Sequence, residues 1–177
     1  MAIIPGIYAS QISGHLATNN YFLISQSLPS AVSTVTFSSI PATYKSLQVR
    51  FNLICSTTGQ NITIQLNGNG TGYSEHYLYG TGSTTVASGF ASQPYTWMLQ
   101  AGTVGTYPNI GIIDVIDYAN TSKYKTIKTL GGANQNTSTG IIEMASGVWQ
   151  NASATTSLMI AVTVGTFTGT VSLYGIS

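Results

Sequence analysis

Four carboxylates are the groups in this 177-residue chain that could perform acid–base chemistry: Glu75, Asp114, Asp117 and Glu143. Glycoside hydrolysis and related reactions need two acidic groups that face one cleft, roughly 5 to 10 Å apart. Asp114 and Asp117 are three residues apart on or beside a strand, and this spacing puts their side chains on opposite faces. We expect them to cap the turn over residues 117–120, with a shared cation as the alternative.

The histidines and the cysteine have no spacing typical of a metal site or of an activated nucleophile. His76 directly follows Glu75, so the two side chains point apart on a strand, and His15 is distant in the sequence. Cys55 is the one cysteine and is expected to be a small buried residue. No nucleophile elbow or Walker loop is present. The sequence therefore predicts no catalytic residue, no metal, no cofactor and no enzymatic activity.

Aromatic side chains are the remaining candidates for a binding site. The chain has eleven Tyr and two Trp. Aromatic rings stack on sugars and also anchor protein interfaces, and we take Tyr73, Tyr77, Tyr79 and Trp97 as candidates for either role. Tyr73, Tyr77 and Tyr79 share one parity on a predicted strand, so they face the same side. The alternative is core packing, which we expect for Trp97 and for about half of the Tyr residues.

The shortage of charge is the most unusual property of the composition. The chain is 43% hydrophobic and 5% charged, whereas globular domains are roughly 25% charged. Its five Lys and Arg residues are too few for the basic face that nucleic acids require. No apolar run approaches the roughly 18 residues of a membrane span. With so little charge for solubility, part of the surface is expected to be hidden against other copies, in a homotrimer.

Apolar and polar residues alternate with a period of two through most of the chain, which is typical of half-buried strands. The alternation is clearest in residues 47–53 and 62–66. Residues 110–116 are more continuously apolar and predict a strand covered on both faces. The other predicted strands are residues 32–37, 73–79, 95–99, 124–129, 141–149, 158–164 and 170–176. Turn-forming residues, such as those at 67–70, separate these strands, and no segment keeps a helical spacing.

Nine or ten short strands with regular turns predict an all-β fold, an antiparallel β-sandwich of the jelly-roll type. We assign this sandwich to residues 28–177 and treat residues 1–27 as an extended N-terminal arm. The arm is either an edge strand of its own domain or an anchor that binds a neighbouring subunit. Its candidate anchoring residues are Ile3, Ile4, Ile7, Tyr8, Ile12, His15 and Leu16.

Four stretches of the sequence resemble a group of small structural proteins of tailed bacteriophages. They are IYASQISGHL (7–16), FSSIPATYKSLQVR (37–50), IDYANTSKYKT (116–126) and SLYGI (172–176). The resemblance implies a component of the outer surface of a virion. It supplies no catalytic residues.

Three functions are compatible with this resemblance and with the missing catalytic groups. The first is a capsid decoration (cement) protein that stabilises the head shell, with its arm bound to the major capsid protein. The second is a tail-fibre or receptor-binding module that contacts a tail protein and recognises host surface glycans. The third is a free carbohydrate-binding module. Partners expected from these readings are further copies of the chain, a capsid or tail protein and a glycan, with no nucleic acid and no membrane.

Overall fold

The computed structural model describes residues 20–99, 107–134 and 140–177, and these residues form twelve β-strands and no helix. A helix able to cross a membrane is accordingly not found among them. The strands are β1 (Tyr21–Ser27), β2 (Thr34–Phe37), β3 (Ser46–Cys55), β4 (Ile62–Leu66), β5 (Tyr73–Gly80), β6 (Thr85–Gln93), β7 (Thr96–Leu99), β8 (Asn109–Ile116), β9 (Lys125–Asn134), β10 (Gly140–Trp149), β11 (Leu158–Val162) and β12 (Phe167–Ile176).

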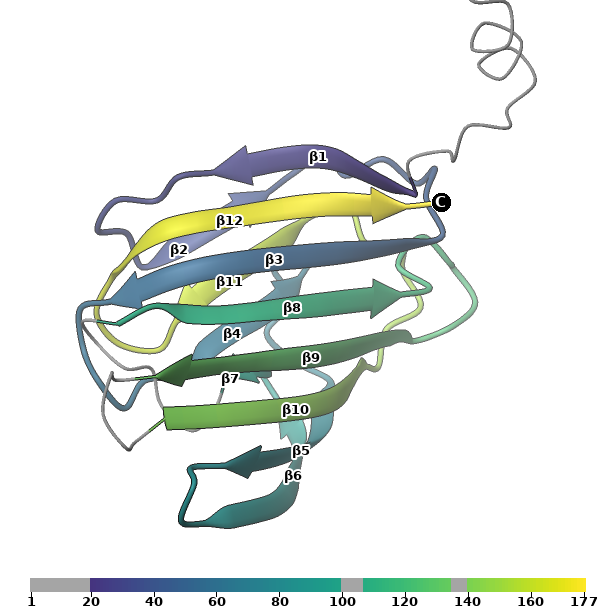
Figure 1. Ribbon diagram of the computed structural model, residues 1–177. Helices are drawn as coiled ribbons and strands as arrows, with labels where there is room; N and C mark the ends of the chain where they lie inside the picture. The colour runs from purple at the N-terminus through teal and green to yellow at the C-terminus, as the bar shows by residue number, and fades with distance from the viewer. Residues whose placement is uncertain (1–19, 100–106, 135–139) are drawn as a thin grey trace, which may run out of the picture.

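The strands form two antiparallel sheets that pack face to face (Figure 1). The larger sheet has eight strands in the order β1-β12-β3-β8-β9-β10-β5-β6, and the smaller has four in the order β2-β11-β4-β7. Every pairing between neighbouring strands is antiparallel. The predicted all-β antiparallel sandwich is confirmed.

The strand order is that of a jelly roll with two insertions. When β5–β6 and β9–β10 are set aside, eight strands remain, four in each sheet. Their orders are first-eighth-third-sixth and second-seventh-fourth-fifth, so each step along the chain except the fourth crosses to the other sheet. This is the arrangement of a double-sheet jelly roll, as predicted. The inserted strands extend the larger sheet beyond β8, at the lower part of Figure 1.

The hydrophobic core lies between the two sheets and follows from the alternation in the sequence. On β3, for example, Leu47, Val49 and Leu53 are fully buried, while the intervening Arg50 and Asn52 are exposed. Ile62, Ile64 and Leu66 on β4 and Leu158 and Ile160 on β11 meet them from the smaller sheet. Burial of such side chains stabilises the fold by about 1.5–3 kcal/mol each. Cys55 is 2% exposed, as the sequence predicted.

The structure differs from the sequence-based strands in three places. Within the predicted arm, β1 is an edge strand that pairs with β12 of the same domain. The strand β6 was not predicted, because its small and polar residues show no regular alternation, and it pairs only with β5. The expectation that residues 110–116 are covered on both faces is wrong. The smaller sheet covers one face of β8, and on the other face Ile110 and Ile112 are 55% and 41% exposed.

Candidate functional site

Tyr73, one of the four predicted binding aromatics, belongs to the core. Its side chain is fully buried and stacks on Trp149 with ring centroids 6.0 Å apart. The Tyr73 hydroxyl accepts a hydrogen bond of 2.7 Å from the Leu66 backbone N–H. Burial raises the pKa of Tyr73 to about 12. The prediction that Tyr73 contacts a glycan or a partner is therefore wrong, since its strand parity directs it between the sheets.

The structure brings the other three predicted aromatics together in one cluster with Phe90. Tyr77 stacks on Tyr79 and on Phe90 at centroid distances of 6.1 and 5.4 Å, and Phe90 meets the edge of Trp97 at 4.2 Å. Tyr77 is buried, and Tyr79, Phe90 and Trp97 are half-buried. These rings join the β5–β6 hairpin to β7, the edge strand of the smaller sheet. Packing is their evident role, because each ring already has aromatic partners.

The outer face of the eight-stranded sheet, turned away from the smaller sheet, holds the most conspicuous group of exposed side chains. Large apolar residues face one another in successive pairs across four strands: Ile112 opposite Leu130, Leu130 opposite Met144, and Met144 opposite Leu78. Ile110 and Ile142 lie in the adjacent row. We call this set the apolar patch, and its side chains are between 41% and 62% exposed: Leu78, Ile110, Ile112, Leu130, Ile142 and Met144.

Glycines alternate with isoleucines in the apolar patch, so that protruding side chains alternate with hollows. In one row Ile110 pairs with Gly132, Gly132 with Ile142, and Ile142 with Gly80. Each glycine leaves a gap beside an isoleucine. A hollow of about 590 Å³ lies over Gly132, between Ile110 and Ile142. A smaller one of about 210 Å³ lies beside Gly80 and Ile142.

The outer face of the smaller sheet is different in character. Its strands β2, β4 and β11 direct mostly small or polar side chains to that side, among them Thr36, Gln65 and Ala161. Antiparallel sheets commonly have one face packed on the core and a polar face in water. The smaller sheet follows this rule, and the apolar patch on the larger sheet breaks it.

A second group of side chains on the same outer face surrounds Arg50, on the half of the sheet formed by β1, β12, β3 and β8. The guanidinium carbon of Arg50 lies 5.0 Å from the ring centroid of Tyr21 and 4.9 Å from that of Tyr174. Arg50 Nε donates to Gln48 Oε1 at 2.7 Å, and Gln48 Nε2 donates to Asp114 Oδ1 at 2.8 Å. We call these five residues the Arg50 site.

The carboxylates do not form an open acidic pair. Glu75 and Glu143 both point to the inner side of the larger sheet and are 2% and 0% exposed, so neither faces solvent. Burial raises the pKa of Glu75 to about 7, an effect opposed by its hydrogen bond from the Trp97 backbone N–H and increased by the charge of Glu143. Asp114 is on the outer face, and Asp117 is in the turn after β8. No group of three or more His, Cys, Asp or Glu in the described part of the chain is arranged to hold a metal.

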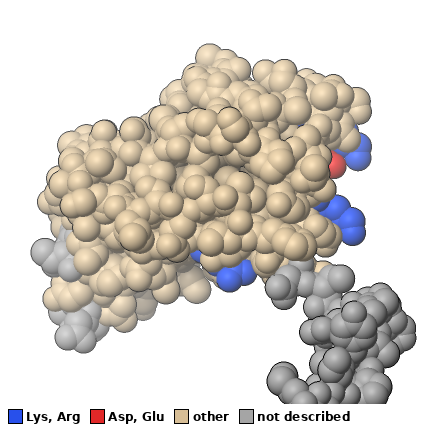
Figure 2. All heavy atoms as spheres, turned by 90° about the horizontal axis from the view of Figure 1, so that it is seen from above, with Lys and Arg blue, Asp and Glu red and all other residues tan. Residues whose placement is uncertain are grey.

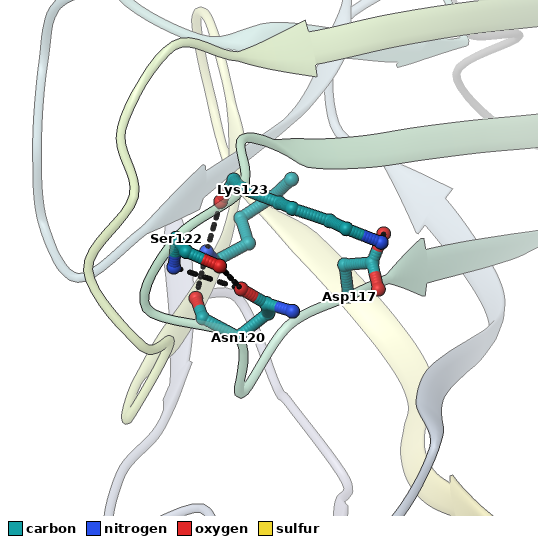
Figure 3. A network of polar contacts seen from close by, with 5 residues as sticks. Asp117, Asn120, Ser122 and Lys123 are labelled. Atoms are coloured by element: carbon teal, nitrogen blue, oxygen red, sulfur yellow. Dashed lines mark hydrogen bonds and ion pairs between the residues drawn. The ribbon is translucent and has the colours of Figure 1, made fainter.

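The turn between β8 and β9 is organised by Asn120 and by a buried lysine (Figure 3). Asn120 Oδ1 accepts hydrogen bonds from the backbone N–H and the hydroxyl of Ser122 at 2.8 and 2.9 Å. Lys125 is fully buried, and its ammonium donates to the backbone carbonyls of Asn120, Lys123 and Ala152. Burial lowers the pKa of Lys125, and the charge of Asp117 opposes that effect. Asn120, rather than the predicted Asp117, caps this turn with its side chain.

Charge is as sparse on the folded surface as in the composition. In the view of Figure 2 the few charged side chains lie at the right and lower edges, and the rest of the described surface in that view is uncharged. Lys123 and Asp117 approach to 4.0 Å as the one ion pair within residues 20–99, 107–134 and 140–177.

Neither exposed group on the outer face was predicted as a site. For the apolar patch a usable signal existed, since Leu130, Ile142 and Met144 have the opposite strand parity to the buried residues of β9 and β10. The Arg50 site has no signal in the sequence, because Tyr21, Asp114 and Tyr174 are distant in the chain from Gln48 and Arg50. The predicted anchoring residues lie outside the described residues: Ile3, Ile4, Ile7, Tyr8, Ile12, His15 and Leu16.

Comparisons with known proteins find similarity among solved structures alone. No protein-family model matches the sequence, and no curated protein is detectably similar to it. The crystal structure of the galectin LEC-6 from Caenorhabditis elegans aligns with 89% of this chain and 98% of that chain, at 11% identity and with a TM-score of 0.41.

Proposed function

We propose that this protein is a non-enzymatic structural subunit of the outer surface of a bacteriophage particle, and that its copies associate through the apolar patch. The observation that supports this proposal most directly is the exposure of six large apolar side chains in one contiguous group. Monomeric soluble proteins rarely leave large contiguous apolar surfaces in water, and such surfaces mark interaction sites. Surface charge keeps monomers soluble, and this chain is only 5% charged. Association that covers the apolar patch would remove this surface from water.

The apolar patch is complementary in shape to the same patch on a second copy of the chain. Neighbouring strands are about 4.8 Å apart, so isoleucines and glycine gaps alternate at that interval along the row Ile110-Gly132-Ile142-Gly80. Two copies related by a two-fold axis can place the isoleucines of each in the gaps of the other. An isologous contact requires a surface that is complementary to itself in this way.

Within the particle we favour the role of a capsid decoration protein, with the N-terminal arm bound to the major capsid protein. The phage assignment is supported by the resemblance of the four sequence stretches, and the decoration role by a surface suited to contacts between copies. A jelly roll with short connections is also a suitable building block, since this fold recurs in viral capsids.

The double variant Leu130→Asp, Met144→Asp is expected to lose self-association. Both positions are exposed, so the variant should fold, but closing the contact would bury four carboxylates at a cost of several kcal/mol per ion. Sedimentation velocity of the wild type measures the order of the assembly: the two-fold contact through the patch closes a dimer, in place of the homotrimer expected from the sequence. The variant should sediment as a monomer. Thr36→Asp, on the polar outer face of the smaller sheet, is the matched control and should assemble normally. Normal assembly of the double variant would contradict the proposal.

Glycan recognition, as in a receptor-binding module, is the second candidate function. The Arg50 site favours it, because that site combines one exposed and one half-buried aromatic ring with fixed polar groups on the same surface. Small-molecule and sugar sites use such a combination of apolar rings and a few oriented polar groups. The four aromatics predicted from the sequence support this function less well, since they pack against one another or in the core.

A further inference from the structure

The guanidinium of Arg50 is held in a fixed position on the outer face. The centroids of the Tyr21 and Tyr174 rings lie 5.0 and 4.9 Å from the guanidinium carbon. These rings belong to β1 and β12, which lie on the same side of β3 in the sheet. Cation–π contacts at this range are favourable even at exposed sites. Ordering a long side chain normally costs entropy on binding, and these rings remove part of that cost before any ligand arrives.

Hydrogen bonds fix the rotation of the guanidinium as well. A carboxylate only accepts hydrogen bonds, so Asp114 requires the amide nitrogen of Gln48 to face it, at 2.8 Å. The amide oxygen of Gln48 is then turned toward Arg50 and accepts from Nε at 2.7 Å. Gln48 is only 7% exposed, so this orientation is protected from competing water. The two terminal amino groups of Arg50 therefore point in a defined direction.

Those two amino groups have no hydrogen-bond or ion-pair partner among the described residues. They form a planar fork that matches the two oxygens of a carboxylate. Asp114, the nearest acidic residue in the network, is already engaged by Gln48. The site thus presents an oriented cation that is not neutralised within the described chain.

The surroundings of the fork suit a sugar better than a peptide. Tyr21 is 49% exposed and Tyr174 half-buried, so their rings can contact the C–H groups of a pyranose. Beside them, Gln26 donates to the Ser172 hydroxyl at 2.9 Å and keeps further donor and acceptor capacity for sugar hydroxyls. A peptide that added as a strand would pair with the free edge of β1 and not lie over the Arg50 fork, because β12 and β3 are interior strands whose backbone groups are used within the sheet.

We propose that the Arg50 site binds the carboxylate of an acidic sugar in a surface polysaccharide. The proposal deepens the second candidate function, glycan recognition, and does not depend on association through the apolar patch. The carboxylate lies against the Arg50 fork, and the ring of the same uronic acid residue contacts Tyr21 or Tyr174. The fork discriminates an acidic sugar from its neutral counterpart.

The test is a calorimetric titration of the full chain with an oligogalacturonate, compared with the same oligosaccharide after reduction of its carboxylates to alcohols. We expect the affinity for the acidic form to be at least about tenfold higher than that for the reduced form. This ratio is typical of the contribution of a charge-assisted hydrogen-bonded pair. Arg50→Gln should abolish this difference, and Arg50→Lys should keep only part of it, because an ammonium lacks the fork. Lys45→Gln, another exposed cation, is the control and should bind like the wild type.

Equal binding of the acidic and the reduced oligosaccharide would overturn the proposal, and this comparison requires no variant that might misfold. Equal binding of an oligoglutamate would also overturn it, because the site would then recognise charge alone. The Leu130→Asp, Met144→Asp variant separates the two proposals. It should bind the oligogalacturonate normally, so a failure of self-association and a failure of glycan binding are observed independently.

Discussion

Replacing Glu75 with glutamine is expected to remove most of the pH dependence of stability between about pH 5 and pH 8. Burial raises the pKa of Glu75 from 4.5 to about 7, so the folded protein binds this proton more tightly than the unfolded chain does. The contribution of protonated Glu75 is fully present below pH 4.5 and is lost as the pH rises through about 7. The difference between the pKa values of the unfolded and folded states corresponds to about 3 kcal/mol in the free energy of unfolding.

Urea unfolding at pH 5 and pH 8 measures this effect. The wild type is expected to be less stable at pH 8 by up to about 3 kcal/mol, and Glu75→Gln should change little between these pH values because a neutral amide keeps the acceptor for the Trp97 N–H. Asp117→Asn, an acid-to-amide change in the turn after β8, is the control and should retain the wild-type dependence. A wild type whose stability rises from pH 5 to pH 8 would show that Glu75 is not the dominant buried acid.

Replacing Lys125 with methionine is expected to destabilise the fold by about 3 kcal/mol or more, and so to lower Tm by about 6–12 °C. Methionine fills a similar volume but donates no hydrogen bond. The variant therefore leaves three carbonyls, those of Asn120, Lys123 and Ala152, without the Lys125 ammonium. These carbonyls belong to the β8–β9 turn and to the segment after β10, so their connection would also be lost.

Lys128→Met is the matched control for this variant. Lys128 lies on the same strand as Lys125 but its side chain is exposed on the outer face, and surface substitutions usually change stability by less than about 0.5 kcal/mol. Thermal unfolding followed by circular dichroism compares the two variants with the wild type. If Lys125→Met melts at the wild-type temperature, the hydrogen bonds of the buried ammonium do not stabilise the turn.

Much of the sandwich could be predicted because its strands are covered on one face only. On β3 and β11 the alternation of apolar and polar residues reports that single covered face directly, and both strands were predicted from it. The turn at residues 67–70 was predicted from its glycines, and Asn67 and Gly68 indeed have positive φ angles of 54° and 62°. The strand β6 was missed because pairing with β5 stabilises it without an apolar face of its own.

The sites were harder to predict, because they depend on which side of each strand the neighbouring sheet covers. The apolar run of β8 was interpreted as a strand covered on both faces, whereas the exposed isoleucines belong to the apolar patch. Tyr73 and Trp97 were candidates by residue type, but type does not distinguish a packed ring from an exposed one. The Arg50 site combines residues from β1, β3, β8 and β12, and only the strand order brings them together.

The oxidation rate of Met144 is the measurement that tests self-association through the apolar patch most directly. Met144 is 54% exposed in the single chain, and Met159 on the outer face of the smaller sheet is half-buried and serves as an internal reference. Peroxide oxidises methionines according to their accessibility, and mass spectrometry quantifies each site. The single variant Leu130→Asp keeps Met144 and places one carboxylate of each copy in the contact, so we expect it to be a monomer. Met144 should react several-fold more slowly in the wild-type assembly than in this monomer, with Met159 unchanged. An assembled wild type in which Met144 reacts as fast as in that monomer would contradict the proposed interface.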